Sequence, residues 1–315
     1  MSARLPDFFI VGQPKSGTTA LYEMLRRHPQ VFMPELKETW FFAQELRSSR
    51  RGPASRHPDT PEQYLALFAP AAPEQRIGEA SPSYLWSRQA AARIVQARPD
   101  ARIIAILREP ASFLHSLHLQ YLQSDIETEK DFRTAIELEP ARREGRAVPR
   151  SSTRPQALLY SDQVRYVEQL RRYHDVFPAE QILVLIYEDF RADNETAVRT
   201  VLRFLDVDDR APIESIEANP AVRVRSPRLQ GFARSLYLGR SPSTRAAKKL
   251  ITASTPRSLR RRALAMQYRA QLGKPRSPDP AWMLELRRRF KPEVVQLGEY
   301  LGRDLTAVWG YDELD

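Results

Sequence analysis

The chain has 315 residues, of which 42% are hydrophobic and 28% are charged, so it can bury a core of ordinary globular size. It contains no cysteine, which excludes disulfides, thiolate metal sites and a cysteine nucleophile. The formal net charge is +10, and no stretch approaches the ~18 consecutive apolar residues needed to cross a bilayer.

The amino-terminal segment predicts a strand, a loop and a helix. Residues 7–11 (DFFIV) form a continuous apolar run, which is typical of a buried strand. This run is too short for the core of a signal peptide, so we expect a cytoplasmic protein. Residues 12–17 form the loop, and the helix that begins at Thr18 presents one apolar face before Pro29 stops it.

The loop and the first helical turn carry the side chains expected of a phosphate site. Backbone N–H groups at a helix amino terminus and the helix dipole favour an anion there. Lys15 adds a positive charge, and neighbouring hydroxyls can donate hydrogen bonds to phosphate oxygens. The candidate phosphate ligands are therefore Lys15, Ser16, Gly17, Thr18 and Thr19.

The position of the lysine distinguishes this loop from a Walker loop, G-x-x-x-x-G-K-[ST]. The spacing between Gly12 and Gly17 fits, but Thr18 stands where the lysine should be, and Lys15 lies two residues before the second glycine. A P-loop nucleotide kinase or other phosphotransferase stays an alternative, because it would share the strand, the loop and the helix. Such an enzyme should require Mg²⁺.

Two further apolar runs predict buried strands at residues 102–107 (RIIAIL) and 182–187 (ILVLIY), whereas residues 47–61 and 139–155 are typical of surface loops. Amphipathic helical patterns alternate with the strands. This alternation predicts an α/β fold, a P-loop-like three-layer domain with a central parallel sheet and helices on both faces. Ligands of such sheets bind beyond the carboxyl ends of the strands. The expected helices cover residues 111–123, 161–173, 195–204 and 282–300.

The excess of basic residues is confined to residues 218–278. The sequence pattern of this segment predicts helices and loops. This segment contains 15 Lys and Arg residues and no Asp or Glu, whereas the rest of the chain carries 34 basic and 39 acidic residues. Such a segment binds phosphate, an anionic surface or nucleic acid, or it is merely solvated. No domain boundary accompanies it, so we expect a single domain over residues 1–315.

Two amino-terminal motifs resemble those of sulfotransferases that use 3'-phosphoadenosine-5'-phosphosulfate (PAPS). The sequence PKSGTTAL, which follows the first strand, resembles the 5'-phosphosulfate loop of this family. Residues 37–42 (KETWFF) resemble the K-E-x-x-F-F segment of Golgi-type carbohydrate sulfotransferases and of related bacterial members.

Later motifs match the same family in order and spacing. Residues 108–110 (REP) followed by Ser116 resemble its 3'-phosphate motif, and residues 187–189 (YED) resemble its Y-E-D segment. Residues 301–305 (LGRDL) also look family-like. The four principal motifs span roughly residues 7–205, so the resemblance covers most of the predicted sheet.

The resemblance implies that PAPS is the co-substrate and that no metal is needed. Lys15 and the loop N–H groups suit the 5' end of the donor, and Lys15 could neutralise charge on the bridging oxygen as the sulfuryl group leaves. The planar fork of Arg108 suits the 3'-phosphate, with Ser116 as a hydroxyl donor. Tyr187 is expected to contact the adenine.

The family resemblance also implies that two arginines of the basic segment contact the donor. Bacterial relatives tend to show an Asn followed by R-x-R-S, which corresponds here to Asn219 and residues 223–226. The resemblance therefore suggests that Arg223 and Arg225 close over the 3' end of the donor.

The acceptor hydroxyl needs a general base, and the family resemblance places it at Glu38. Glu79, in the sequence GEASPSY, is the second candidate. Golgi-type relatives often have a lysine where Ala80 stands. Cytosolic relatives use a histidine instead, but we expect His115 and His118 to pack or to face solvent.

The predicted reaction transfers a sulfuryl group from PAPS to a hydroxyl of a sugar, lipid or phenol and releases 3'-phosphoadenosine-5'-phosphate (PAP). A small-molecule, lipid or glycan acceptor is expected, and the basic segment could contact an anionic membrane. A non-enzymatic binder of anions or nucleic acid is the second alternative. We expect no nucleic-acid partner, because residues 218–278 contain few aromatics and no nucleic-acid motif.

Overall fold

The computed structural model describes residues 4–47, 57–150, 152, 154–214 and 277–314 of the chain. It also gives the backbone of two short paired antiparallel strands, β6 (Arg223–Val224) and β7 (Leu272–Gly273). Arg225 and nearly all of the basic segment lie outside the described residues, as does the side chain of Arg223.

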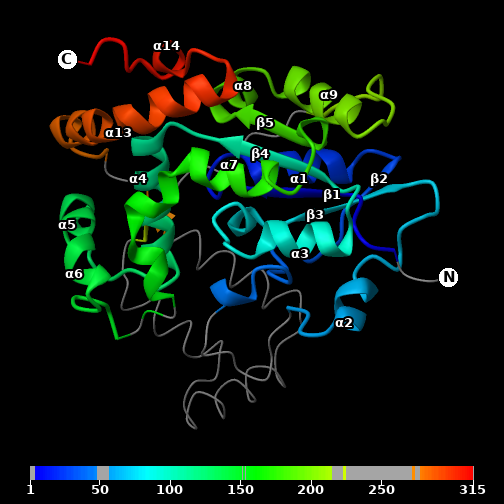
Figure 1. The fold of residues 1–315 in the computed structure, drawn as a ribbon, viewed down its shortest axis with the longest axis horizontal. Helices are drawn as coiled ribbons and strands as arrows, with labels where there is room; N and C mark the ends of the chain where they lie inside the picture. The colour runs from blue at the N-terminus through cyan, green and yellow to red at the C-terminus, as the bar shows by residue number, and fades with distance from the viewer. Residues whose placement is uncertain are drawn as a thin grey trace, which may run out of the picture.

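A five-stranded parallel sheet forms the centre of the protein (Figure 1). Its strand order is β2-β3-β1-β4-β5, which places β1 in the middle with β3 and β4 on either side. Parallel strands covered on both faces need continuous apolar sequences, and β1 is buried throughout. The strands are β1 (Phe8–Gly12), β2 (Val31–Phe32), β3 (Arg76–Ala80), β4 (Arg102–Leu107) and β5 (Ile182–Ile186).

The predicted α/β fold and the three predicted strands are confirmed, with one change at the end of β5. Tyr187 does not extend that strand but begins a short helix, α8 (Tyr187–Ala192). The sequence pattern did not reveal β2 and β3. The first has only two residues, and the second reads RIGEA, which contains two charged residues and a glycine.

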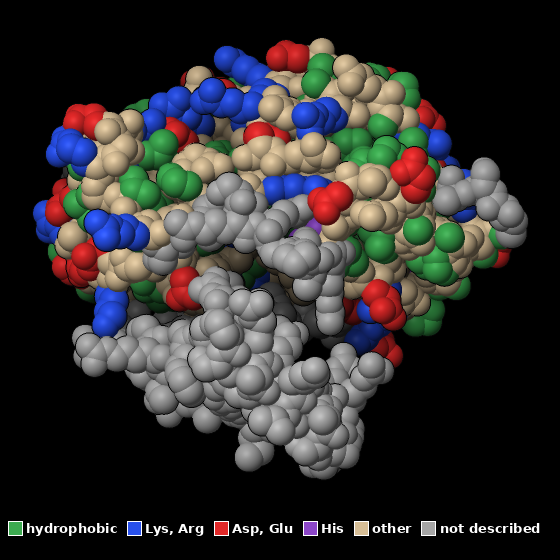
Figure 2. All heavy atoms as spheres, turned by 90° about the horizontal axis from the view of Figure 1, so that it is seen from below, with side chains coloured by type: hydrophobic (Ala, Val, Ile, Leu, Met, Phe, Trp, Pro, Cys, Tyr) green, Lys and Arg blue, Asp and Glu red, His purple; other side chains and the backbone are tan. Residues whose placement is uncertain are grey.

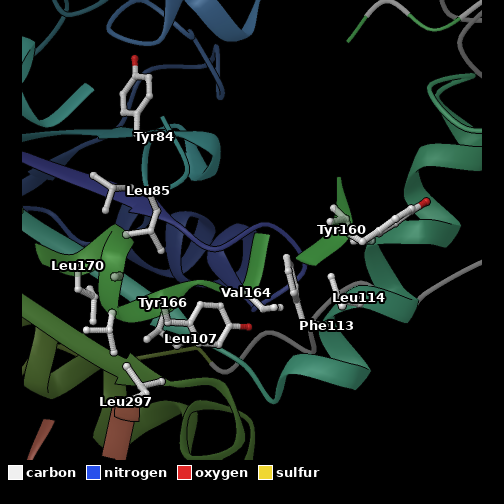
Figure 3. Close-up of a cluster of buried hydrophobic side chains, with 14 of the residues drawn as sticks. Tyr84, Leu85, Leu107, Phe113, Leu114, Tyr160, Val164, Tyr166, Leu170 and Leu297 are labelled. Atoms are coloured by element: carbon white, nitrogen blue, oxygen red, sulfur yellow. The ribbon is translucent and has the colours of Figure 1, made fainter. Parts of the chain in front are cut away.

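Alternate side chains of β1 face two separate apolar clusters, one on each side of the sheet. Phe8 and Ile10 pack with helices α1 (Thr18–Arg26) and α9 (Asn194–Phe204). Phe9 and Val11 belong to the larger cluster on the other side, part of which Figure 3 shows around Leu107 and Tyr166. That cluster includes side chains of α3 (Ala90–Ala97), α4 (Pro110–Gln123), α7 (Tyr166–His174) and α13 (Pro280–Leu301).

The predicted helices are present, with shifted boundaries. The pattern over residues 161–173 divides into a 3-10 turn, η4 (Tyr160–Val164), and helix α7. Shorter helices connect the main elements: α2 (Pro61–Ala66), α5 (Phe132–Glu137), α6 (Glu139–Arg143) and α14 (Leu305–Trp309). The other 3-10 turns are η1 (Gln44–Leu46), η2 (Pro82–Tyr84), η3 (Pro155–Leu158) and η5 (Ala179–Gln181). None of the helices in the described ranges is long and apolar enough to span a bilayer.

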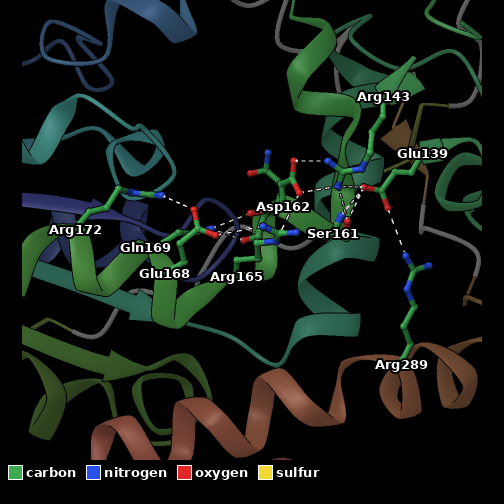
Figure 4. Close-up of polar contacts among 10 residues, drawn as sticks. Glu139, Arg143, Ser161, Asp162, Arg165, Glu168, Gln169, Arg172 and Arg289 are labelled. Carbon is green, nitrogen blue, oxygen red and sulfur yellow. Dashed lines mark hydrogen bonds and ion pairs between the residues drawn. The ribbon is translucent and has the colours of Figure 1, made fainter. Parts of the chain in front are cut away.

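The prediction of a surface loop over residues 139–155 was wrong at its start. Residues 139–143 form α6, whose second residue is a proline, and proline is well tolerated in a first helical turn. The Glu139 carboxylate is buried and accepts hydrogen bonds from the backbone N–H and hydroxyl of Ser161, at 3.0 and 2.8 Å (Figure 4). It also lies 3.6 Å from Arg143 and 3.8 Å from Arg289.

Candidate functional site

A cavity of about 670 Å³ opens at the carboxyl ends of the strands. It is lined from several segments that are far apart in the sequence, because parallel strands deliver their following loops to one edge of the sheet. The predicted site residues that line it are Lys15, Gly17, Thr18, Thr19, Glu38, Arg108, Ser116 and Tyr187.

The loop after β1 leaves the amino terminus of α1 open to a ligand. No side chain caps this helix end, so its first N–H groups have no side-chain acceptor. Gly17 has a φ of 84°, and a Cβ atom there would lie 2.9 Å from the ring of Phe190. A side chain at this position would therefore be strained and would also collide with the aromatic wall of the cavity.

Ser16 is not brought to the cavity with its neighbours. Its side chain is completely buried, and its hydroxyl donates to the carbonyl of Pro14 at 3.4 Å. The loop thus presents Lys15, Thr18 and Thr19, whereas Ser16 faces the interior. Its predicted role as a hydroxyl donor has no support from this geometry.

Lys15 and Arg108 are held together at the cavity wall. Arg108 donates from Nη1 to the carbonyl oxygen of Lys15 at 2.9 Å, which ties the end of β4 to the loop after β1. Burial lowers the pKa of the Lys15 ammonium, and the positive charge of Arg108 lowers it further, whereas Glu38 raises it. An anion placed between Lys15 and Arg108 would relieve this repulsion.

Tyr187 and Arg108 form a second contact across the ends of β4 and β5. The guanidinium carbon of Arg108 lies 4.7 Å from the centre of the Tyr187 ring. The Nε of Arg108 is buried and finds no acceptor among the described residues. An unsatisfied buried N–H on a guanidinium fits a phosphate ligand, because a phosphate oxygen would supply the missing acceptor.

Glu38 faces the same cavity from the segment that follows β2. Its backbone N–H donates to the carbonyl of Ala80 at 2.9 Å, so the segment is fixed to the end of β3. The Glu38 carboxylate lies 3.5 Å from the Lys37 ammonium, and its side chain is 42% exposed. A carboxylate at this position can reach a ligand in the cavity, which a proton acceptor must do.

Glu79 does not line the cavity. Only 1% of it is exposed, and its two oxygens accept hydrogen bonds from three buried hydroxyls. Thr39 and Ser81 donate to Oε1 at 2.7 and 2.6 Å, and Tyr64 donates to Oε2 at 2.5 Å. Burial raises its pKa, and these hydrogen bonds oppose the rise. Glu79 therefore supports the neighbouring segment instead of meeting an acceptor.

The two histidines of α4 pack against neighbouring side chains, which is one of the two outcomes that the sequence left open, and His115 is only partly buried. His118 is buried, and its Nδ1 lies 3.0 Å from the hydroxyl oxygen of Tyr160. Burial lowers the pKa of His115 to about 4, and its ring packs against Phe132 at 5.4 Å between ring centres. Neither histidine lines the cavity.

Several lining residues escaped the sequence prediction. Gln120 and Gln123 follow Ser116 on α4 at spacings of four and seven residues, so a helical projection of α4 could have found them. Arg191 and Asn194 come from α8 and the start of α9, and no motif marked them.

The lining is strongly cationic. Among the described lining residues, Glu38 is the one carboxylate against the four basic side chains of Lys15, Lys37, Arg108 and Arg191. No group of three or more metal-ligating side chains occurs within the described part of the chain. The cavity thus has the charge, the open helix end and the size to hold a nucleotide with more than one phosphate.

The fold and this cavity define an α/β protein with a cationic cavity at the strand ends, and comparisons with known proteins specify the family. The Sulfotransferase family model matches residues 6–211, which is well over half of the chain. The chain therefore belongs to the sulfotransferase family.

Two relatives and one solved structure illustrate the similarity. Human carbohydrate sulfotransferase 15 is 30% identical over 269 residues, covering 71% of this chain and 46% of the relative. Mouse heparan sulfate glucosamine 3-O-sulfotransferase 3B1 is 29% identical over 204 residues, covering 65% and 47%. The chain thus spans about half the length of these curated relatives. A solved sulfotransferase from Alicyclobacillus acidocaldarius superposes with a TM-score of 0.66 and 25% identity, over 96% of this chain and 98% of that one.

Proposed function

We propose that this chain transfers a sulfuryl group from PAPS to a hydroxyl group and releases PAP. One observation carries the proposal: Lys15, Arg108 and Glu38 follow three different strands and line one cavity. Two cations and an open helix end suit a donor with phosphate groups at both ends, and one carboxylate suits the acceptor. Membership of the sulfotransferase family supports the same reaction.

Each residue has a role that its position can support. PAPS supplies the sulfuryl group and a phosphate oxygen that accepts the electrons of the broken S–O bond. Lys15 and the N–H groups at the start of α1 would bind the 5' end and favour negative charge there. Arg108, with Ser116 and Tyr187, would bind the 3'-phosphate and adenine. Arg223 lies in β6, which has Cα atoms within 8 Å of those of α4, and this proximity supports its proposed role at the 3' end of the donor.

Glu38 would take the proton of the acceptor hydroxyl as its oxygen bonds to sulfur. The carboxylate is on the same cavity as Lys15, and Glu38 is the general base candidate that the geometry favours over Glu79. A carbohydrate hydroxyl is the acceptor that we propose, because two similar proteins are named for carbohydrate and glucosamine sulfation. Lipid and phenol hydroxyls are outcomes that an assay can separate.

The test is transfer of label from ³⁵S-PAPS to three acceptors offered separately: a soluble glycosaminoglycan, a long-chain alcohol and a simple phenol. We expect label in a carbohydrate with the wild-type chain and none with Lys15→Ala. Label in the phenol alone would overturn the carbohydrate part of the proposal. No transfer to any acceptor, together with no binding of PAP, would overturn sulfuryl transfer itself.

A further inference from the structure

The residues that follow α14 reach the back of the proposed donor site. Helices α13 and α14 lie beside α8 in Figure 1, and Trp309 ends α14. Gly310, with a φ of 64°, then turns the chain so that Tyr311 is buried. Arg287 of α13 holds this turn, because it donates to the carbonyl of Gly310 at 2.8 Å and lies over the Tyr311 ring at 4.7 Å.

Tyr311 contacts the residue that follows Arg108. Its hydroxyl donates to Oε1 of the Glu109 carboxylate. The same carboxylate accepts hydrogen bonds from the backbone N–H groups of Ala111 and Ser112, at 2.9 and 2.7 Å, and so caps α4. Tyr311 therefore fixes the cap at the junction between Arg108 and the helix that carries Ser116.

Trp309 contacts the residue that follows Tyr187. Its indole Nε1 donates to Oε2 of Glu188 at 2.8 Å. Burial raises the pKa of Glu188, whereas the hydrogen bonds from Trp309 and from the Glu109 backbone lower it. Glu188 thus contacts both Trp309 and the backbone of Glu109, the residue that Tyr311 holds. Asp189 adds an ion pair with Arg303, but this pair is about half exposed and contributes little.

We propose that Trp309 and Tyr311 are positioning residues for the 3'-phosphate of the donor, acting through Glu188 and Glu109 on Tyr187 and Arg108. This inference rests on the proposed function. Arg108 directly precedes Glu109 in the chain, and Tyr187 directly precedes Glu188. These two carboxylates are the ones that Tyr311 and Trp309 hold. The structure gives residues 187–189 two separate uses, since Tyr187 faces the cavity and the two acidic residues bind the carboxyl-terminal segment.

The consequence is selective for one part of the ligand. The guanidinium of Arg108 is aligned by the Lys15 carbonyl and the Tyr187 ring, and a bidentate contact with phosphate depends on that alignment. Removing the hydrogen bond from Tyr311 to Glu109 or the one from Trp309 to Glu188 should therefore weaken binding of the 3'-phosphate. The effect on the 5'-phosphate loop should be smaller, because that loop belongs to β1 and α1 and meets Arg108 at the Lys15 carbonyl.

The experiment compares PAP with adenosine-5'-phosphate, which lacks the 3'-phosphate, by calorimetry on the full chain. The variants are Tyr311→Phe, Trp309→Phe and the double variant, each of which removes a hydrogen-bond donor and keeps an aromatic ring. We expect Kd for PAP to rise about threefold in each single variant and about tenfold in the double variant, which is the range for one or two lost hydrogen bonds. Kd for adenosine-5'-phosphate, which keeps the adenine that Tyr187 would contact, should rise by a smaller factor than Kd for PAP in each variant.

The ratio of the two Kd values is the decisive readout, because both ligands meet the same folded fraction of each sample. Arg289→Gln is the matched control, since Arg289 is a half-exposed residue of α13 that pairs with Glu139 away from the cavity (Figure 4). An unchanged ratio in the double variant, with or without a lower melting temperature, would overturn the inference. A wild-type chain that binds the two ligands equally would instead overturn the assignment of Arg108, and the inference with it.

Discussion

Three residues near the cavity adopt backbone conformations that side chains rarely take. Lys15, Glu38 and Trp40 have φ values of 62°, 63° and 58°. Such left-handed conformations cost about 1–3 kcal/mol each and persist only where the surroundings hold them. Here the holding contacts are visible, because Arg108 binds the Lys15 carbonyl and the Glu38 N–H binds the carbonyl of Ala80. The proposed catalytic side chains are thus fixed by their backbones.

At this residue scale, Glu38→Gln tests the proposed base. The amide keeps the shape of the side chain but cannot take a proton, so we expect kcat to fall by ~10²–10⁴ with the donor Kd unchanged. Glu35→Gln is the matched control, because Glu35 is an exposed carboxylate of the same segment that does not line the cavity. A near-normal kcat in Glu38→Gln would show that another residue is the general base.

At the scale of elements, strand β3 shows how a buried carboxylate can support the site. Glu79 on β3 binds Thr39, which lies between Glu38 and Trp40, and Tyr64 of α2. The Thr39 hydroxyl also lies 3.1 Å from that of Tyr84. This network joins β3, α2, η2 and the segment after β2, so Glu79 should stabilise the protein and align Glu38.

Glu79→Gln should lower the free energy of unfolding by about 1–3 kcal/mol, because the amide nitrogen cannot accept the hydrogen bond that a buried hydroxyl donates to the carboxyl oxygen it replaces. We also expect a lower kcat with unchanged Kd for PAP. Tyr64→Phe removes one donor of the same network but keeps the ring that stacks on Phe41 in the Glu38 segment, so it should lower stability and spare kcat. Urea unfolding and steady-state kinetics measure both effects. Loss of kcat in Glu79→Gln at full stability would favour Glu79 itself as the base.

Helix α4 should make the stability of the protein depend on pH. Burial lowers the pKa of His115 to about 4, below the 6.5 of an ordinary histidine. Between these values the unfolded chain binds a proton at this position and the folded protein does not, so stability is complete above pH 6.5 and falls as the pH drops towards 4. His115→Gln should lose less stability than the wild type between pH 7 and 5 in urea unfolding. An equal loss of stability in His115→Gln and in the wild type over this pH range would show that His115 does not cause the pH dependence.

The sequence predicted the elements whose signals are local and continuous. The apolar runs of β1, β4 and β5 and the loop between β1 and α1 could be read directly, and the parallel sheet then brought Lys15, Arg108 and Tyr187 to one edge. Strand β3 could not be read, because its buried Glu79 is satisfied by hydroxyls distant in sequence. The orientation of Ser16 away from the cavity likewise depends on tertiary packing.

At the scale of the whole molecule, charge is divided unevenly along the chain. Basic and acidic side chains are interspersed over the described part of the face in Figure 2, whereas residues 218–278 carry 15 basic residues and no acidic ones. That segment lies almost entirely outside the described residues, so its contact with the donor or with a membrane stays a prediction from the sequence. The cytoplasmic location and the single domain over residues 1–315 stay predictions as well.

The basic segment should bind anionic vesicles at low salt, because each Lys or Arg near such a surface contributes ~1 kcal/mol. We expect sedimentation with phosphatidylserine vesicles but not with phosphatidylcholine vesicles, and loss of binding at moderate salt. Reversing three charges, in Lys248→Glu/Lys249→Glu/Arg261→Glu, should abolish sedimentation. Equal sedimentation with neutral and anionic vesicles would contradict the prediction.

The most direct measurement is calorimetry of the wild-type chain with PAP and with ATP, each with and without Mg²⁺. We predict that PAP binds more tightly than ATP and that Mg²⁺ leaves its Kd unchanged, because the described lining of the cavity offers cations to phosphate. Arg108→Ala should weaken PAP binding by about 1.5–3 kcal/mol, the contribution of a hydrogen bond to a charged group. Tighter binding of ATP that depends on Mg²⁺ would contradict a sulfuryl donor site and favour a phosphotransferase.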